Sequence, residues 1–306
     1  MSGTTFLRYM EQQINLMTLS RKFGTARNYA RAQNSLRAFL NGRDLPINCI
    51  NENLIQEYSN WLERRGVVRN TVSFYMRILR AVYNKAVKDR MARQSYPFRN
   101  VYTGIDKTRK KALDEYSVRK LLELDLEHFP ALQLSRDIFI FSYCMRGMSF
   151  VDIALLRKKD FDGKYISYRR QKTGQRLTIR LEPCAENIIR RYEEETQGSP
   201  YIFPIITSEA PGEIYRQYQT ALGYHNRKLK KLARMARMNI PLSSYCARHT
   251  WATVARNHNI PVSVIAAAMG HTSEKTTLIY LDSLDNSMID KANRLVLKSL
   301  RSPVSL

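Results

Sequence analysis

Hydrophobic residues recur every three or four positions through the first hundred residues, a spacing that places them on one face of an α-helix. The pattern predicts four helices, over Phe6–Leu19, Thr25–Leu40, a segment that begins at Asn51, and Asn70 to about Met91. The side of the fourth helix that lies opposite its apolar stripe carries Asn70, Ser73, Arg77, Arg80, Asn84 and Lys88. This side is either a solvated surface or a basic face that binds a ligand.

The pattern changes after residue 112. Alternating apolar and polar residues predict two strands, Tyr165–Arg170 and Arg176–Leu181, and the polar sequence between them predicts a hairpin turn. Helical spacing predicts the other elements, over Asp114–Leu124, Pro130–Arg146, Glu186–Glu195, Ile214–Met238, Tyr245–Asn257, Val262–Met269, Thr276–Asp282 and Met288–Leu300. The expected fold class is therefore mainly α with a small β-sheet, in which a helical domain at residues 1–105 precedes a mixed α+β domain at residues 112–306.

Charge narrows the class of partner. The 306 residues include 50 Lys and Arg against 27 Asp and Glu, which gives a net charge of +23. The segment Asp106–Lys111 between the two predicted domains is short, polar and strongly basic, as expected of a linker that follows a DNA backbone. Such an excess of basic residues favours a polyanionic partner whose phosphates supply binding energy. No apolar run approaches the roughly 20 residues that a membrane span needs, so we expect no membrane partner and a cytoplasmic, nucleoid-associated protein.

The cysteines indicate no special chemistry. Cys49, Cys144, Cys184 and Cys246 lie far apart, and no two of them form a Cys-x-x-Cys pair. Zinc binding and a disulfide framework are both disfavoured by this spacing. We expect reduced, mostly buried thiols, and neither a metal nor a cofactor.

Three short motifs follow one another near the C-terminus. They are Ala-Arg-His-Thr at 247–250, Gly-His at 270–271 and Thr-Thr-Leu-Ile-Tyr at 276–280. Arg248 precedes His271 by 23 positions, and His271 precedes Tyr280 by nine. In this order and at this spacing, the motifs resemble the C-terminal signature of the tyrosine recombinases of the lambda-integrase and Xer-like family. The resemblance extends more weakly over the rest of the chain.

The resemblance implies a role for each of these residues. Tyr280 is the expected nucleophile, Arg248 a phosphate clamp, His271 a hydrogen-bond donor to the phosphate, and Lys172, in the hairpin turn, the general acid. A phenol can attack phosphorus to form a covalent phosphotyrosine, guanidinium groups can hold two phosphate oxygens, and a cationic acid can protonate the departing 5′-oxygen. Because the phosphotyrosine keeps the energy of the broken bond, the reaction requires neither ATP nor a metal.

Two positions depart from the family pattern. The family usually has a histidine three residues before the arginine of Arg-His-Thr, where this chain has Tyr245. A phenol can donate a hydrogen bond to phosphate but cannot act as a base near neutral pH, so Tyr245 is expected to bind phosphate only. The family's first arginine lies in a Gly-[Leu/Met]-Arg-x-x-[Asp/Glu] pattern, and Ser149 occupies that position between Gly147 and Asp152.

Two arginines are candidates for the missing charge. Arg146 lies three residues before Ser149, and Arg170 lies two residues before Lys172. The period of a strand would place Arg170 on the same face as Lys172, and this argument favours Arg170. Asp152 matches the family's supporting acidic residue and is not expected to be catalytic.

The resemblance also implies partners. Residues 1–105 resemble the SAM-like core-binding domain, and the expected DNA contacts are Arg77, Arg80, Lys88, Lys110 and Lys111. The expected partner is double-stranded DNA with specific recombination sites. The expected assembly is a homotetramer in which Met288–Leu300 packs on a neighbouring subunit. DNA-bending or directionality proteins are the expected accessory partners. Ser149 and the Ala-Arg-His-Thr-Trp sequence resemble the Bacteroides-type branch.

Two other functions fit the same residues. A type IB topoisomerase uses similar tyrosine chemistry but relaxes DNA without exchanging partners. A non-catalytic DNA-binding protein derived from a recombinase would explain Ser149 and Tyr245 by loss of activity. Survival of the four residues Tyr280, His271, Arg248 and Lys172 favours an active enzyme, of integrase or invertase type.

Overall fold

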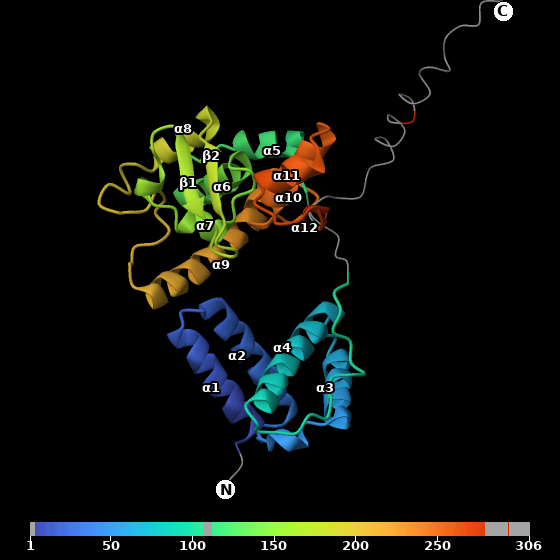
Figure 1. The fold of residues 1–306 in the computed structure, drawn as a ribbon. Helices are drawn as coiled ribbons and strands as arrows, with labels where there is room; N and C mark the ends of the chain where they lie inside the picture. Colours follow the sequence, from blue (N-terminus) through green and yellow to red (C-terminus); the bar gives the residue numbers. More distant parts are fainter. Residues whose placement is uncertain (1–3, 107–111, 279–292, 294–306) are drawn as a thin grey trace, which may run out of the picture. The chain divides into compact units, whose positions relative to one another are not determined.

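The computed structural model describes residues 4–106, 112–278 and 293. The chain divides into two compact units, residues 1–108 and 109–306, each of which has its own hydrophobic core (Figure 1). The mainly α fold with a small sheet that the sequence predicts is confirmed.

The first unit consists of helices. They are α1 (Phe6–Leu19), α2 (Phe23–Phe39), α3 (Glu52–Arg64) and α4 (Arg69–Lys88), with a short 3₁₀ turn at Ile47–Cys49. Helix α4 contacts each of the other three, and its apolar stripe, which includes Met76, Leu79 and Tyr83, is buried in the core. Asn51 caps α3, because its side-chain oxygen accepts a hydrogen bond from the amide of Leu54 at 2.9 Å.

The polar side of α4 is partly covered by the chain itself. Asn70 does not cap the helix but exchanges hydrogen bonds of 2.8 and 3.0 Å with the backbone of Asp106. Ser73 is fully buried and donates to the carbonyl oxygen of Gly104 at 2.5 Å. The expectation that this whole side of α4 faces solvent or a ligand is therefore wrong for its N-terminal half.

The second unit combines helices with one hairpin. The helices are α5 (Glu115–Leu122), α6 (Pro130–Cys144), α7 (Phe150–Ala154), α8 (Pro183–Arg191), α9 (Pro211–Met235), α10 (Cys246–Asn257), α11 (Val262–Ala268) and α12 (Glu274–Leu278). Strands β1 (Tyr165–Arg169) and β2 (Arg176–Arg180) pair antiparallel, with Arg169 opposite Arg176 next to the turn. A 3₁₀ turn at Lys158–Asp160 precedes the hairpin.

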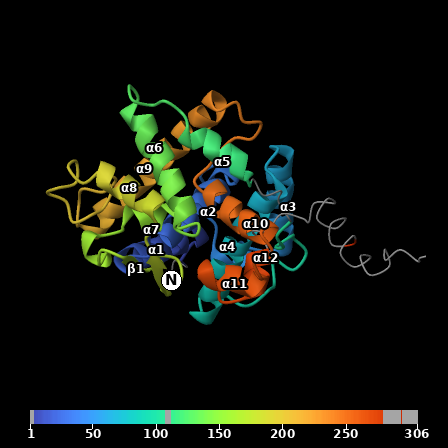
Figure 2. The same cartoon turned by 90° about the horizontal axis from the view of Figure 1, so that it is seen from above.

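Helix α6 is the centre of this unit. It contacts α5, α7, α8, α9 and α10, and Phe139, Ile140 and Phe141 are all buried. Since other helices pack around α6, even its Arg136 and Asp137 are buried, and they pair with each other at 2.9 Å. Figure 2 views the same ribbon from above, where α10, α11 and α12 lie next to one another at one end of the unit, as their contacts require.

Several local predictions need correction. Helix α8 begins at Pro183, three residues earlier than predicted, because proline is favoured in the first turn of a helix. Helix α7 was not predicted, since its five residues are too few to display a period. Cys49 and Cys184 are exposed, so the expectation of mostly buried thiols is wrong, and the sulfurs of Cys144 and Cys184 lie 2.9 Å apart. The segment Met288–Leu300 lies outside the described residues.

Candidate active site

Arg248 lies in the first turn of α10 and is only 4% exposed. Its Nη1 donates to the carbonyl oxygen of Gly147 at 2.7 Å. Its Nη2 donates to the carbonyl oxygen of Met269 at 2.7 Å and to Nε2 of His271 at 2.9 Å. A buried cation held by several acceptors has little rotamer freedom, so helix α10, the α6–α7 loop and the α11–α12 loop together fix the position of this guanidinium.

Gly147 allows the α6–α7 loop to approach α10 closely. Its φ of +72° lies in the left-handed region that favours glycine. A Cβ atom placed there would lie 2.8 Å from both Cα and Cγ of Arg248. Glycine at position 147 is therefore required by the packing of the α6–α7 loop on Arg248.

His271 contacts the Arg248 guanidinium from the α11–α12 loop. Its Nδ1 lies 2.8 Å from Oγ1 of Thr277, which is fully buried in α12. Burial is the largest cause that lowers the pKa of His271, to about 4, and the positive charges of Arg248, Arg170 and Lys172 lower the pKa further. The imidazole is therefore neutral near pH 7, and three cationic side chains lie close to it.

Arg170 follows the last residue of β1 and is 8% exposed. Its backbone closes the hairpin turn, since its amide donates to the carbonyl oxygen of Gln175 at 2.9 Å. Its Nη1 donates to the carbonyl oxygen of Gly270, the residue before His271. Arg170 thus lies beside the Arg248–His271 pair, as the Arg170 hypothesis requires.

Arg146, the other candidate, lies in the α6–α7 loop with a positive φ of 57° and is half-buried. Within residues 4–106 and 112–278, no hydrogen bond or ion pair involves its guanidinium. The pKa of the buried Tyr168 shows which charges lie near it. Burial and Asp152 raise this pKa, and the charges of Arg248, Arg170 and Arg146 lower it. Arg146 is therefore close to the site, but its charge is not among those that lower the pKa of His271.

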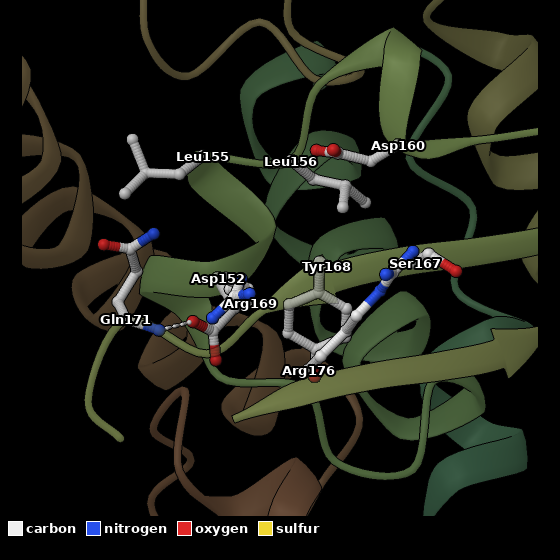
Figure 3. A pocket seen from close by; sticks show the side chains of 9 residues that line it. All are labelled: Asp152, Leu155, Leu156, Asp160, Ser167, Tyr168, Arg169, Gln171 and Arg176. Atoms are coloured by element: carbon white, nitrogen blue, oxygen red, sulfur yellow. Dashed lines mark hydrogen bonds between the residues drawn. The ribbon is translucent and has the colours of Figure 1, made fainter. Parts of the chain in front are cut away.

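Ser149 joins a different set of contacts. Its hydroxyl donates to Oδ2 of Asp152 at 2.6 Å, while Oδ1 of Asp152 accepts from the backbone amide of Gln171 at 2.8 Å. Figure 3 shows this second hydrogen bond, which ties α7 to the hairpin turn. Asp152 is 4% exposed. It therefore supports the position of the hairpin, in agreement with its expected structural role.

A cavity of about 360 Å³ opens beside Asp152 (Figure 3). The residues that line it are Asp152, Leu155, Leu156, Asp160, Ser167, Tyr168, Arg169, Gln171 and Arg176. Neither Arg248 nor His271 nor Arg170 belongs to this lining. The cavity is therefore separate from the cluster that these three residues form.

Two other predicted site residues are exposed, and a third lies outside the described chain. Lys172 is exposed in the hairpin turn, so the argument that it shares a strand face with Arg170 is wrong. Tyr245 precedes α10, is 46% exposed, and its ring centroid lies 5.8 Å from that of His249. Tyr280 lies outside the described residues.

The predicted DNA-binding residues of α4 differ in exposure. Arg77 is half-buried and its Nε donates to the carbonyl oxygen of Ser73 at 3.4 Å. Arg80 is exposed and donates to Oγ1 of Thr103 at 3.2 Å, and Lys88 is exposed in the last turn. Lys110 and Lys111 lie outside the described residues.

The sequence interpretation missed two features. One is a hollow of about 510 Å³ in the first unit, lined by Arg31, Asn34, Ser35, Thr71, Phe74 and Tyr75 of α2 and α4. The other is Thr277, whose contact with His271 follows from the fold of the α11–α12 loop. The Thr-Thr pair in the quoted motif was the available signal for Thr277.

The described residues form neither a metal site nor a membrane span. In residues 4–106 and 112–278, no three His, Cys, Asp or Glu side chains form a group that could hold a metal ion. None of the helices described is long and apolar enough to cross a membrane.

Comparison with known proteins places both units in one family. A family model of the phage integrase SAM-like domain matches residues 5–102, and a model of the phage integrase family matches residues 113–287. The tyrosine recombinase XerA of Pyrococcus furiosus is 23% identical over 74% of this chain and 88% of its own length. The tyrosine recombinase XerD of Pseudomonas aeruginosa is 24% identical over 84% of this chain and 85% of its own.

Solved structures have the same fold. A lambda integrase dimer bound to a COC′ core site matches with a TM-score of 0.67 and 16% identity, over 92% of this chain and 98% of that one. The Tn1549 transposon integrase in complex with circular intermediate DNA matches with a TM-score of 0.65 and 18% identity, over 94% and 99%. A lambda integrase tetramer bound to a Holliday junction matches with a TM-score of 0.63 and 16% identity, over 92% and 78%.

Proposed function

The chain belongs to the phage integrase family and is a tyrosine recombinase, and we propose that it exchanges DNA strands at specific sites through a covalent 3′-phosphotyrosine on Tyr280. The observation that carries the proposal is the convergence of Arg248, His271 and Arg170 on the loops before α7 and α12. Cationic and hydrogen-bonding side chains that are held rigidly before substrate arrives can stabilise the charge of a phosphoryl transition state.

The proposed reaction has two equivalent halves. The phenolic oxygen of Tyr280 attacks the scissile phosphorus and releases its proton to water, while the bond from phosphorus to the 5′-oxygen breaks. Lys172 gives a proton to the departing 5′-oxygen, for which its exposed position at the tip of the hairpin turn is suitable. A 5′-hydroxyl from another strand then attacks the phosphotyrosine, which restores both the phosphodiester and the tyrosine.

Two guanidinium groups are proposed to bind the phosphate. Arg248 is one, and Arg170 supplies the charge that Ser149 lacks. The support for Arg170 is its hydrogen bond to Gly270 and its effect on the pKa of His271, together with the engagement of the Ser149 hydroxyl by Asp152. Tyr245, exposed at the start of α10, is proposed as a further hydrogen-bond donor to phosphate. This arrangement would place the chain in the Bacteroides-type branch.

The proposed partner is double-stranded DNA. Residues 1–105 act as the core-binding domain, residues 106–111 as the linker and residues 112–306 as the catalytic domain. The basic residues that contact phosphates are Arg77, Arg80, Lys88, Lys110 and Lys111. The proposed assembly is a tetramer that joins two specific sites, with the nucleoid as its location and DNA-bending or directionality proteins as accessories. The net charge of +23 and the lambda integrase tetramer on a Holliday junction support this proposal.

The test is a covalent-complex assay with supercoiled plasmid that carries the DNA flanking the gene. Wild-type protein should form complexes that survive detergent, and Tyr280→Phe should bind the same DNA but form none. Tyr224→Phe is the matched control, because Tyr224 is an exposed tyrosine of α9, and it should retain full cross-linking. Cross-linking by Tyr280→Phe would identify a different nucleophile.

The same plasmids separate the competing functions. A recombinase should exchange strands only between paired target sites, whereas a type IB topoisomerase should relax a plasmid without such sites. A non-catalytic binding protein would shift the DNA in a gel but would never become covalently attached to it. Strand exchange that depends on paired sites therefore excludes both alternatives.

A further inference from the structure

Thr277 contacts the imidazole of His271 from the side opposite Arg248. It lies in α12, is 0% exposed, and its Oγ1 is 2.8 Å from Nδ1 of His271. Nε2 of the same ring faces Nη2 of Arg248 at 2.9 Å. Both ring nitrogens of His271 are thus engaged before any DNA is present.

These contacts determine where the imidazole proton lies. A guanidinium has only donors, so Nε2 of His271 must accept from Arg248. Because His271 is neutral, Nδ1 then carries the ring proton and donates it to the Thr277 hydroxyl. In this tautomer His271 has no proton at Nε2 and cannot donate from that nitrogen to a phosphate oxygen.

The family resemblance makes His271 a hydrogen-bond donor to the scissile phosphate. Since Thr277 occupies Nδ1, donation has to come from Nε2, which requires the opposite tautomer. Protonation of both nitrogens is opposed by burial and by the charges of Arg248, Arg170 and Lys172, which hold the pKa of His271 at about 4 in the free protein. Transfer of the ring proton from Nδ1 to Nε2 provides the donor without adding a charge. It also reverses the hydrogen bond at Nδ1.

A hydroxyl group can serve both forms of the ring, since it has one proton to donate and lone pairs to accept with. We propose that Thr277 is a positioning residue, whose hydroxyl holds Nδ1 of His271 in both tautomers and so allows the ring to change from acceptor of Arg248 to donor to phosphate. When Nε2 carries the proton, the Thr277 hydroxyl rotates and donates to Nδ1. The inference rests on the proposed function, because His271 has a phosphate to donate to only if the protein cleaves DNA.

Replacing Thr277 by valine and by serine separates the hydroxyl from the packing. Thr277→Val keeps the shape of the side chain but removes the hydroxyl, and Thr277→Ser keeps the hydroxyl but removes a methyl group. Thr276→Val is the matched control, because Thr276 is the neighbouring threonine and its hydroxyl faces Ser273 at 3.2 Å. The substrate is a nicked duplex of the flanking DNA, on which cleavage traps the covalent complex.

Single-turnover cleavage is the first measurement. Thr277→Val should cleave about 10- to 100-fold more slowly, on the scale of the loss seen when the hydrogen-bond partner of a metal-bound histidine is removed. Its DNA affinity should stay within about twofold, since phosphate contacts elsewhere dominate binding. Thr277→Ser should recover the rate to within about threefold of wild type, and Thr276→Val should cleave normally.

Nitrogen NMR of the His271 ring in the DNA-free protein is the second measurement. Wild type should give the signature of a neutral ring protonated at Nδ1, and Thr277→Val should give a mixture of the two tautomers. Normal cleavage by Thr277→Val, or equal loss in Thr277→Ser and Thr277→Val, would overturn the proposal. If wild-type protein forms no covalent complex at all, the proposed function fails, whereas the NMR comparison still tests the Thr277–His271 hydrogen bond by itself.

Discussion

The guanidinium of Arg170 donates a hydrogen bond to the carbonyl oxygen of Gly270, the residue that precedes His271. This contact brings the end of β1 to the α11–α12 loop, where Arg248 is also anchored through Met269. Two arginine side chains from distant parts of the chain are therefore held by adjacent carbonyl groups.

Arg170→Ala should reduce single-turnover cleavage by on the order of 10²–10³, because a donor to the transition state is lost. DNA affinity should stay close to that of wild type. Arg170→Lys should recover only part of the rate, since an ammonium cannot span two phosphate oxygens. Arg169→Ala is the control: Arg169 is the exposed neighbour, and its replacement should preserve cleavage.

Arg146→Ala tests the competing assignment. Its side chain is half-buried and makes no hydrogen bond within residues 4–106 and 112–278, so its loss should have a modest effect on rate. An inactive Arg146→Ala beside an active Arg170→Ala would transfer the clamp to Arg146. Normal cleavage by both variants would mean that one clamp is sufficient.

Gly147→Ala should impair both folding and cleavage. The new Cβ would lie 2.8 Å from Cα of Arg248, at a φ of +72° that alone costs about 1–3 kcal/mol for a residue with a side chain. Gly163→Ala is the matched control, because Gly163 also has a positive φ but nothing within 4 Å of the added atom. The melting temperature and cleavage rate of Gly147→Ala should both fall further than those of the control.

His225 should make the second unit sensitive to acid. It is 5% exposed and stacks on Phe150 with ring centroids 4.7 Å apart, and burial first and then Lys228 lower its pKa to about 3. Below pH 6.5, His225 binds a proton in the unfolded chain but not in the folded chain. The contribution of His225 to the free energy of unfolding is therefore fully present above pH 6.5 and decreases as the pH falls toward 3. The slope from this group is about 1.4 kcal/mol per pH unit.

Chemical denaturation between pH 7 and pH 4 measures this slope. His225→Phe preserves an aromatic ring beside Phe150 and should flatten the pH dependence, whereas His128→Asn, in an exposed loop, should leave it unchanged. An identical slope in His225→Phe and wild type would rule out His225 as its origin.

DNA binding should weaken steeply with salt. Every phosphate that a basic residue neutralises adds about −0.9 to the slope of log affinity against log salt concentration. Lys88→Ala should reduce the magnitude of the slope by about one, because Lys88 is exposed on α4. Glu57→Gln, a change to an exposed acidic residue of α3, serves as the control. A slope near zero for wild-type protein would contradict phosphate-dominated binding.

Strand cleavage should continue in excess EDTA. In a metal-dependent nuclease, metal ions held by carboxylates supply the positive charge that stabilises the transition state. In the proposed mechanism Arg248, Arg170 and Lys172 supply this charge. The measurement is the yield of covalent complex with EDTA and with added magnesium. Activity that disappears in EDTA and returns with magnesium would replace the proposed mechanism.

The local sequence pattern predicted most of the elements, α7 excepted, but only part of the site. Periodicity located α1 and both strands to within one residue, because each has one face buried and the other exposed. The burial of Arg170 also follows from alternation, as Tyr168 on the same side of the strand is buried. The turn between the strands, by contrast, breaks the period, and Lys172 lies there.

Contacts between distant segments left no periodic signal. The approach of Gly147 to Arg248 joins residues 101 positions apart, and the two hydrogen bonds exchanged between Asn70 and the backbone of Asp106 turn a predicted open face of α4 into a contact. Motif spacing predicted that Arg248 and His271 act together, but only the folded α11–α12 loop reveals Thr277 as the partner of His271.

The carbonyl anchors have a consequence for how this protein can change over generations. Met269 accepts the hydrogen bond of Arg248 with its backbone carbonyl oxygen, which every amino acid has. Substitution of Met269 by a residue of similar size therefore preserves this anchor. Gly147 provides the same kind of oxygen but has no room for a larger residue. In a library built to retarget the enzyme, position 269 therefore accepts only apolar residues of similar size, because Met269 is fully buried, whereas position 147 should remain glycine.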